Sequence, residues 1–153
     1  MAAVLERSES VRRYGTGDDA FIERLSTLAF GDFDGEAAAH TRSLVRKPSA
    51  QTRVAVRGSE RLGFVVVELG AGTSWVQAIA VASRERGRGL GALLMAEAER
   101  VAREAGARTL SLTTAQANVE ALELFMKRGF RIERRLPRFY GRGQDACVLA
   151  LAL

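Results

Sequence analysis

The chain contains few of the residues that build disulfide bonds, metal centres and membrane spans. Its 153 residues include one cysteine, Cys147, and one histidine, His40. A lone cysteine excludes an internal disulfide framework and a cysteine-rich zinc site, and a lone histidine excludes a multi-histidine metal centre. No apolar run approaches the roughly 20 residues that a membrane-spanning helix needs. We therefore expect neither a bound metal ion nor a membrane partner.

Linkers, repeats and low-complexity segments are also absent, and only Pro48 and Pro137 interrupt the chain. With 47% hydrophobic and 27% charged residues, the composition is typical of a soluble globular protein with its own core. We therefore expect a single domain over residues 1–153. Residues 1–13 carry charged side chains and no hydrophobic signal core, which predicts a cytoplasmic protein.

The positive charge is confined to one part of the chain. The net charge is +5, from 23 basic and 18 acidic residues, and the two signs balance up to residue 83. The whole excess falls within residues 84–142, and every basic residue except Lys47 and Lys127 is an arginine. Arginine favours forked contacts to phosphate and carboxylate groups. Such a segment fits nucleic acid, a phosphate-bearing cofactor or a solvated surface.

Hydrophobic periodicity predicts alternating strands and helices. Strands are expected over residues 11–14, 53–57, 62–69, 75–81, 109–113, 130–134 and 146–153, with a loop around Pro137 before the last one. Helices are expected over residues 20–29, 36–46, 90–105 and 118–129. The strand–helix–strand units of the second half favour local parallel pairing. The order of elements therefore predicts a mixed α/β domain.

A glycine-rich turn precedes the longest predicted helix, with the sequence Arg86-Gly87-Arg88-Gly89-Leu90-Gly91. Glycines allow the backbone to curl tightly, so that several amide N–H groups can point at one anion. The helix start adds partial positive charge, and the combination suits a diphosphate. A plain tight turn is the alternative. Two other nucleotide-binding motifs do not fit. A P-loop would need a Lys-Ser/Thr pair after its last glycine, and this pair is missing. A dinucleotide-binding fold would place its glycines after the first strand, whereas here they follow the fourth.

Three further motifs accompany this turn in a fixed order. They are Ala78-Ile79-Ala80-Val81, Asn118-x-x-Ala121 and Leu124-Phe125-x-Lys127-x-Gly129-Phe130. With this ordered set, the sequence resembles the GCN5-related N-acetyltransferase (GNAT) family over roughly residues 76–134. The resemblance implies a GNAT fold, with a mixed central sheet of about six to seven strands flanked by four helices. It also implies an acetyl-CoA site where the fourth and fifth strands splay apart.

The resemblance implies roles for individual residues. Backbone groups of Ile79 and Val81 would hold the pantetheine arm of acetyl-CoA. The pyrophosphate would bind the amides of the glycine turn, namely Arg86, Gly87, Arg88, Gly89, Leu90 and Gly91. Asn118 and Phe125 would belong to the same cofactor site, near the predicted helix of residues 118–129.

Two positions depart from the family pattern. Many members carry a tyrosine at the position of Phe125, thought to protonate the departing CoA thiolate, and some carry a glutamate at the position of Thr113. Phenylalanine has no hydroxyl, and threonine cannot act as a general base near neutral pH. Tyr140 is the available proton donor, in a stretch that resembles the tail motif of ribosomal-protein and N-terminal acetyltransferases. Simple packing of Tyr140 at the sheet edge is the alternative.

Several polar residues fall in the segment that walls the acceptor site in the family. Asp32, Asp34 and Glu36 would form an acidic wall that attracts an ammonium group, or they are part of a solvated loop. His40 is either a base that acts through water or an ordinary surface residue of a helix.

We therefore expect an acetyl-CoA-dependent N-acetyltransferase whose acceptor is the primary amine of a peptide or protein N-terminus or of a small molecule. The alternative is a catalytically degenerate acyl-CoA-binding regulatory module, which the missing tyrosine at Phe125 favours. Nucleic-acid binding is a third hypothesis, but the aromatic residues do not interleave with the basic ones as in a single-strand binder. A nucleotide-bearing cofactor explains the charge better, so no nucleic-acid partner is expected. Family members are often dimers, which leaves a homodimer open.

Overall fold

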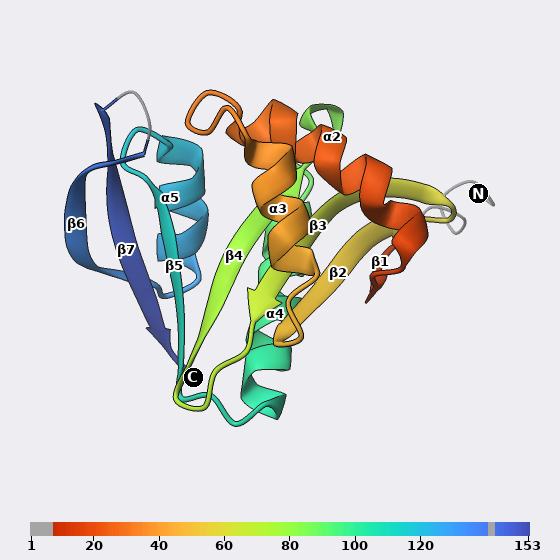
Figure 1. The fold of residues 1–153 in the computed structure, drawn as a ribbon. Helices are drawn as coiled ribbons and strands as arrows, with labels where there is room; N and C mark the ends of the chain where they lie inside the picture. The colour runs from red at the N-terminus through yellow and green to blue at the C-terminus, as the bar shows by residue number, and fades with distance from the viewer. Residues whose placement is uncertain (1–7, 141–142) are drawn as a thin grey trace.

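A mixed sheet of seven strands forms the centre of the computed structural model, which describes residues 8–140 and 143–153 (Figure 1). The strands are β1 (Glu9–Arg13), β2 (Ala50–Arg57), β3 (Glu60–Glu68), β4 (Thr73–Val81), β5 (Thr109–Ala115), β6 (Arg131–Tyr140) and β7 (Gln144–Ala152). Their order across the sheet is β1-β2-β3-β4-β5-β7-β6. Only β4 and β5 pair in parallel, and all other neighbours in the described sheet are antiparallel. The predicted α/β class and strand number are confirmed.

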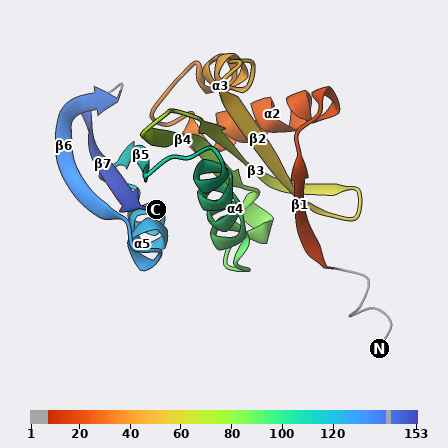
Figure 2. The same cartoon turned by 90° about the horizontal axis from the view of Figure 1, so that it is seen from below.

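Four α-helices in the described residues flank this sheet, as predicted. They are α2 (Asp19–Phe30), α3 (Ala37–Val45), α4 (Leu90–Glu104) and α5 (Val119–Lys127), with two short 3₁₀ helices, η1 (Thr16–Asp18) and η2 (Ser83–Glu85). Figure 2 shows α2 and α3 on one side of the sheet and α4 and α5 on the other. In the part of the chain that the structure describes, no helix has the length and apolar character required to cross a membrane.

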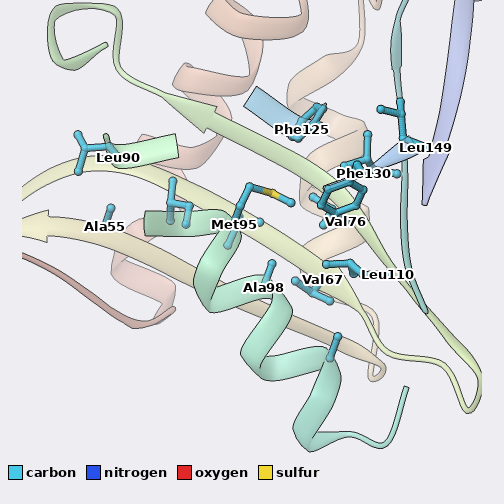
Figure 3. Close-up of a cluster of buried hydrophobic side chains, with 14 of the residues drawn as sticks. Ala55, Val67, Val76, Leu90, Met95, Ala98, Leu110, Phe125, Phe130 and Leu149 are labelled. Atoms are coloured by element: carbon cyan, nitrogen blue, oxygen red, sulfur yellow. The ribbon is translucent and has the colours of Figure 1, made fainter. Parts of the chain in front are cut away.

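Two hydrophobic clusters lie on opposite faces of the sheet. One packs α4 and α5 against the strands and contains Phe125, and Figure 3 shows its side chains. The other packs α2 against the opposite face and contains Ile22. Along β3, Val65 faces the first cluster and Val66 faces the second. A central strand that is buried on both faces explains the uninterrupted apolar run in this part of the sequence.

The predicted loop around Pro137 is wrong, because β6 continues through this residue to Tyr140. β6 lies at the edge of the sheet and pairs only with β7, so its outer backbone needs no partner strand. Proline is tolerated at such an edge. The pairing register shifts between Leu136 and Tyr140, and Arg138 has a positive φ of 52°. The strand therefore bends around the proline instead of ending there.

Some sequence expectations fall on positions that are not described. Residues 1–7, which belong to the segment without a signal core, lie outside the described residues. Arg142, which ends the basic segment, also lies outside them. Cys147 is described and lies buried in the cluster that packs α4 and α5 against the sheet.

Candidate active site

The strands β4 and β5 separate part-way along their length. They pair only from Thr73 to Val76, opposite Thr109 to Leu112. Beyond these residues both described strands continue without pairing to each other, β4 to Val81 and β5 to Ala115. Figure 1 shows the two strands diverging from the end of the sheet near the C-terminus. The splay that the family resemblance implies is therefore present.

A β-bulge at Gln77 marks the point of separation. On β3, Val66 lies opposite Ala78 and Val67 lies opposite Val76, so Gln77 is an extra residue without a partner on that strand. The bulge reverses the order of the faces: Val76 packs with the α4 cluster, whereas Ala78 packs with the α2 cluster. Bulges redirect backbone groups and end regular pairing. The bulge thus lies at the residue that follows the last pair of β4 with β5.

A cavity of about 490 Å³ lies at the separated ends of the two strands. Its wall includes three residues expected to bind the cofactor, Ile79, Asn118 and Phe125, and the expected proton donor Tyr140. The remaining lining residues come mainly from β4, β5, the α2–α3 segment and the end of β6. The fold thus brings residues from both halves of the chain to one apolar cleft.

The α5 side of the cavity is formed by Asn118 and Phe125. The side-chain oxygen of Asn118 accepts a hydrogen bond from the backbone N–H of Ala121 at 3.3 Å, which caps the start of α5. Its side-chain NH₂ group is a separate donor. Phe125 is only 3% exposed and packs against Phe130 with ring centroids 6.0 Å apart. Both residues are therefore held in place by α5 and the core.

The glycine turn has the backbone geometry that the sequence predicts. Gly87 and Gly89 have positive φ angles of 80° and 83°, and no described atom lies within 4 Å of a Cβ added at either one. The N–H of Leu93 donates to the carbonyl of Gly89 at 3.0 Å. The backbone N–H groups of residues 90–92 lie before this first helical hydrogen bond, so they have no acceptor within the helix. The turn therefore presents an open face with free donors.

Close packing at the start of α4 explains two other residues of the motif. The side chain of Leu90 is buried in the core, so only its backbone faces the turn. A Cβ added to Gly91 would lie 3.0 Å from the side chain of Leu124, because α4 and α5 approach each other here. Glycine at position 91 thus serves helix packing, whereas Gly87 and Gly89 serve the shape of the turn.

The charges beside the turn are organised around Glu85. This carboxylate is buried and accepts a hydrogen bond from Nη2 of Arg57 at 2.8 Å, and that contact lowers the pKa of Glu85. Nη1 of Arg88 lies 3.6 Å from Glu85, and its side chain is exposed. Arg86 is also exposed. Glu85 is thus paired mainly with Arg57 and more distantly with Arg88, and the exposed side chain of Arg86 can contact an anion at the turn.

An aromatic cluster borders the opposite side of the cavity. The ring of Tyr140 lies 5.9 Å from that of Phe33 and 5.0 Å from that of Phe139, between centroids. Burial raises the pKa of the Tyr140 phenol to about 12. The hydroxyl therefore stays protonated over the physiological range and can donate a hydrogen bond.

A histidine–carboxylate pair lies beside this cluster. Nδ1 of His40 contacts Oδ2 of Asp34, and the backbone N–H of Glu36 donates to Oδ1 of Asp34 at 2.9 Å. The hydrogen bond to Asp34 raises the pKa of His40. Asp34 and His40 both line the cavity, whereas Asp32 is exposed and lies outside its wall.

The comparison with protein families agrees with this geometry. The model of the GNAT acetyltransferase family matches residues 18–130. The chain belongs to this family. A comparison with curated proteins gives no match.

Solved structures of GNAT acetyltransferases share the fold. Ard1 from Thermoplasma volcanium is 22% identical with a TM-score of 0.85, over 95% of this chain and 97% of that one. The ribosomal-protein-S18-alanine N-acetyltransferase from Escherichia coli is 19% identical with a TM-score of 0.84, over 95% and 94%. A GNAT family acetyltransferase from Elizabethkingia anophelis, with acetyl-CoA bound, is 21% identical with a TM-score of 0.80, over 95% and 98%.

Not every residue selected from the sequence reaches the GNAT cavity. Val81, the last residue of β4, and the glycine turn that follows it lie outside its wall. Thr113 does line the cavity, and Phe125 is there without a hydroxyl. Among residues 8–140 and 143–153, no group of three His, Cys, Asp or Glu side chains forms a metal site.

Sequence reasoning missed Gln77, Phe33 and Phe139, which all line the cavity. The bulge at Gln77 depends on strand pairing, which a single sequence does not display. Phe33 and Phe139 reach the same cavity only after folding, since more than a hundred positions separate them along the chain. The one available signal was Phe139, which directly precedes Tyr140 in the tail motif.

Proposed function

We propose that the chain, as one domain over residues 1–153, is an acetyl-CoA-dependent N-acetyltransferase. Its acceptor would be the primary amine of a peptide or protein N-terminus or of a small molecule. The observation that carries this proposal is the cavity of about 490 Å³ at the separated ends of β4 and β5. Family membership supports the same chemistry.

The residues on the α5 side fit acetyl-CoA. The open face of Gly87 and Gly89, with the free amides that follow, would hold the pyrophosphate, aided by the side chains of Arg86 and Arg88. Unpaired backbone groups of Ile79 and Val81 would hold the pantetheine arm, because β5 no longer pairs with this part of β4. We name the face made by the glycine turn, the end of β4 and α5 the cofactor side.

The face made by the α2–α3 segment and the end of β6 would receive the amine, and we name it the acceptor side. When bound, acetyl-CoA would supply a thioester carbonyl for attack by a neutral amine. A C–N bond would form, the C–S bond would break with CoA leaving as a thiolate, and the attacking nitrogen would lose one proton to solvent. Backbone N–H groups of β4 near the bulge at Gln77 would stabilise negative charge on the carbonyl oxygen. The protonated hydroxyl of Tyr140 would donate a proton to the leaving group.

The degenerate acyl-CoA-binding module loses its main support. That hypothesis rested on the missing hydroxyl at Phe125, but Tyr140 places a protonated hydroxyl at the same cavity. The relative that acetylates an alanine of a ribosomal protein supports a protein amine as the acceptor.

The proposal is tested by following free thiol released from acetyl-CoA. The protein is incubated with a panel of unblocked peptides and small primary amines, and CoA binding is measured separately by calorimetry. Acetylation of at least one amine, verified by mass spectrometry, is the expected result. Tight CoA binding without turnover of any acceptor would favour the regulatory module instead.

A further inference from the structure

The cavity wall contains few groups that can exchange a proton. Among the described residues that line it, the titratable ones are Asp34, His40 and Tyr140. All other described lining residues are apolar, or carry an amide or aliphatic hydroxyl that does not titrate near neutral pH. An amine enters from water mainly as an ammonium ion, because amine pKa values lie at about 8 or above. The proton must leave before the nitrogen can attack a carbonyl carbon.

Two of these three groups cannot accept that proton at neutral pH. Burial raises the pKa of Tyr140 to about 12, so its hydroxyl is already protonated. Burial alone would also raise the pKa of Asp34, but hydrogen bonds from His40 and from the amide of Glu36 outweigh it and lower this pKa. A carboxylate with a lowered pKa is a weak base. Only the imidazole of His40 has a proton affinity near neutrality.

The contacts of His40 leave one ring nitrogen available. Because Nδ1 meets the Asp34 carboxylate, which only accepts hydrogen bonds, we assign the proton of the neutral ring to Nδ1. Nε2 lies 3.7 Å from a carboxylate oxygen of Glu36, too far for a hydrogen bond, and keeps its lone pair. The side chain is 61% exposed although it lines the cavity, which places it at the opening.

We propose that His40, oriented by Asp34, accepts the proton of the acceptor's ammonium group at the opening of the cavity. The N–H bond of the ammonium breaks, its electron pair stays on the nitrogen, and the proton moves to Nε2 of His40, directly or through one water. Asp34 stabilises the imidazolium that forms, and the exposed ring then releases the proton to solvent. This role extends the proposed acetyl transfer and rests on it.

The apolar interior explains why the proton is removed at the opening. Transfer of an unpaired ammonium ion into such a cavity is strongly unfavourable, because the charge loses its hydration. Beyond His40, the described wall leads to apolar residues such as Val76, Ile79 and Phe125. The charged groups that act on His40 in the described structure, Asp34 and Glu36, are both acidic and favour the imidazolium. A neutral amine thus continues inward while the charge remains at the surface.

The first test uses nuclear magnetic resonance, because the chain has a single histidine. In protein freed of any histidine tag, every imidazole signal belongs to His40. We expect its pKa to lie above the ordinary value of about 6.5 and to fall in Asp34→Asn. Asp32→Asn removes the same charge from the same loop without contact to His40, and we expect a much smaller change there. An imidazole pKa that is the same in wild type and Asp34→Asn would overturn the proposed pair.

The second test compares wild type and His40→Gln across pH with acetyl-CoA and the peptides or amines that the wild type acetylates. His40 must be neutral to accept a proton, so kcat/KM of the wild type should level off above the pKa of His40. In His40→Gln only the neutral amine reacts, so kcat/KM should keep rising up to the amine's own pKa. We expect a loss of about 10²-fold at pH 7 that shrinks as the pH approaches the amine's pKa.

The outcomes separate this inference from the proposed function. If the wild type turns over an acceptor and His40→Gln has the same rate and pH profile, His40 is not the proton acceptor. Unchanged CoA affinity in His40→Gln excludes a general loss of structure. If the wild type turns over no acceptor, the proposed function fails, and His40 then has no ammonium proton to accept.

Discussion

The cofactor side and the acceptor side of the cavity use different parts of the chain in different ways. On the cofactor side, the end of β4 and the glycine turn are neighbours in sequence, and they offer backbone amides. On the acceptor side, Phe33 and His40 come from the α2–α3 segment and Tyr140 comes from the end of β6, and all three offer side chains. The cofactor side is continuous with the larger hydrophobic cluster, which includes Leu90 and Phe125.

This difference has a physical consequence for recognition. Backbone amides bind a diphosphate in the same way whatever their side chains are, provided that glycines permit the turn. Side chains contributed by loops distinguish one acceptor from another, and they can change without disturbing the sheet. A single donor site can therefore be combined with many different acceptor sites on one fold.

The largest expected effect tests whether the cofactor side depends on the core. Leu94 of α4 is 0% exposed, and we expect Leu94→Ala to lower the free energy of unfolding by about 2–5 kcal/mol. Leu28→Ala, on the exposed face of α2, is the matched control because Leu28 is 78% exposed. Its effect should stay within about 0.5 kcal/mol. Urea denaturation, monitored by circular dichroism, measures the free energy of unfolding of both variants. Equal decreases in the two variants would contradict the distinction between the buried and the exposed leucine.

The next effect tests whether proton donation belongs to the acceptor side. We expect Tyr140→Phe to lower kcat by about 10²-fold, because it removes the protonated hydroxyl at the cavity, and to leave CoA affinity unchanged. Phe125 lines the same cavity, so Phe125→Tyr in the Tyr140→Phe background should restore part of kcat. Steady-state kinetics and calorimetry measure the two quantities. An unchanged kcat in Tyr140→Phe would remove Tyr140 from the reaction.

The same contrast governs how much could be predicted from the sequence. The glycine turn, the capping residue Asn118 and the helix of Phe125 were all found, because each depends on residues close together in the chain. The bulge at Gln77 and the meeting of Phe33 with Tyr140 were not found, because they depend on strand pairing and on loops that meet only after folding. Local chemistry thus predicted the turn and the helix of the cofactor side, whereas their role in binding acetyl-CoA stays a prediction.

Pro137 shows the limit of local signals within an element. A proline predicts the end of a strand in the interior of a sheet, because it removes an N–H group that a neighbouring strand needs there. β6 has only one neighbour, and the register shift at Pro137 removes even that requirement locally. Whether a strand continues through a proline depends on the position of that strand in the sheet. The sequence of the strand alone does not reveal this position.

A further prediction concerns how the acceptor-side helices are attached. Asp18 is 1% exposed and accepts two hydrogen bonds of 2.8 Å from Arg12 of β1 and one of 2.7 Å from Arg61 of β3. The contacts with Arg12 hold the pKa of Asp18 well below its usual range, against the effect of burial. Since the folded state binds the proton more weakly, this contribution is present above the unfolded pKa of about 3.9 and is lost as pH falls below it.

We therefore expect Asp18→Asn to lower the free energy of unfolding by about 2 kcal/mol at pH 7 and to flatten its decline below pH 4. Denaturation at a series of pH values measures both effects. Asp32→Asn, on an exposed position, serves as the control and should keep the acid decline. A decline in Asp18→Asn as steep as in wild type would show that other carboxylates cause it.

The smallest expected effect is on the turn that defines the cofactor side. Gly89 has a φ of 83°, which a β-branched residue adopts only at a cost of about 1–3 kcal/mol. Space is not the obstacle, because no described atom lies within 4 Å of an added Cβ. In Gly89→Val the backbone should therefore leave the left-handed region, and the free amides before Leu93 should lose their common direction. We expect CoA affinity to fall about tenfold, or about 1.4 kcal/mol, with little change in unfolding.

Gly72→Ala provides the control for Gly89→Val. Gly72 also has open space around an added Cβ, but no positive φ, and it lies at the opposite end of β4. Calorimetry should give wild-type CoA affinity for Gly72→Ala and reduced affinity for Gly89→Val. Equal affinities would show that side chains such as Arg86 and Arg88 bind the pyrophosphate without help from the turn. The cofactor side would then recognise its ligand through side chains, as the acceptor side does, and the contrast between the two would no longer hold.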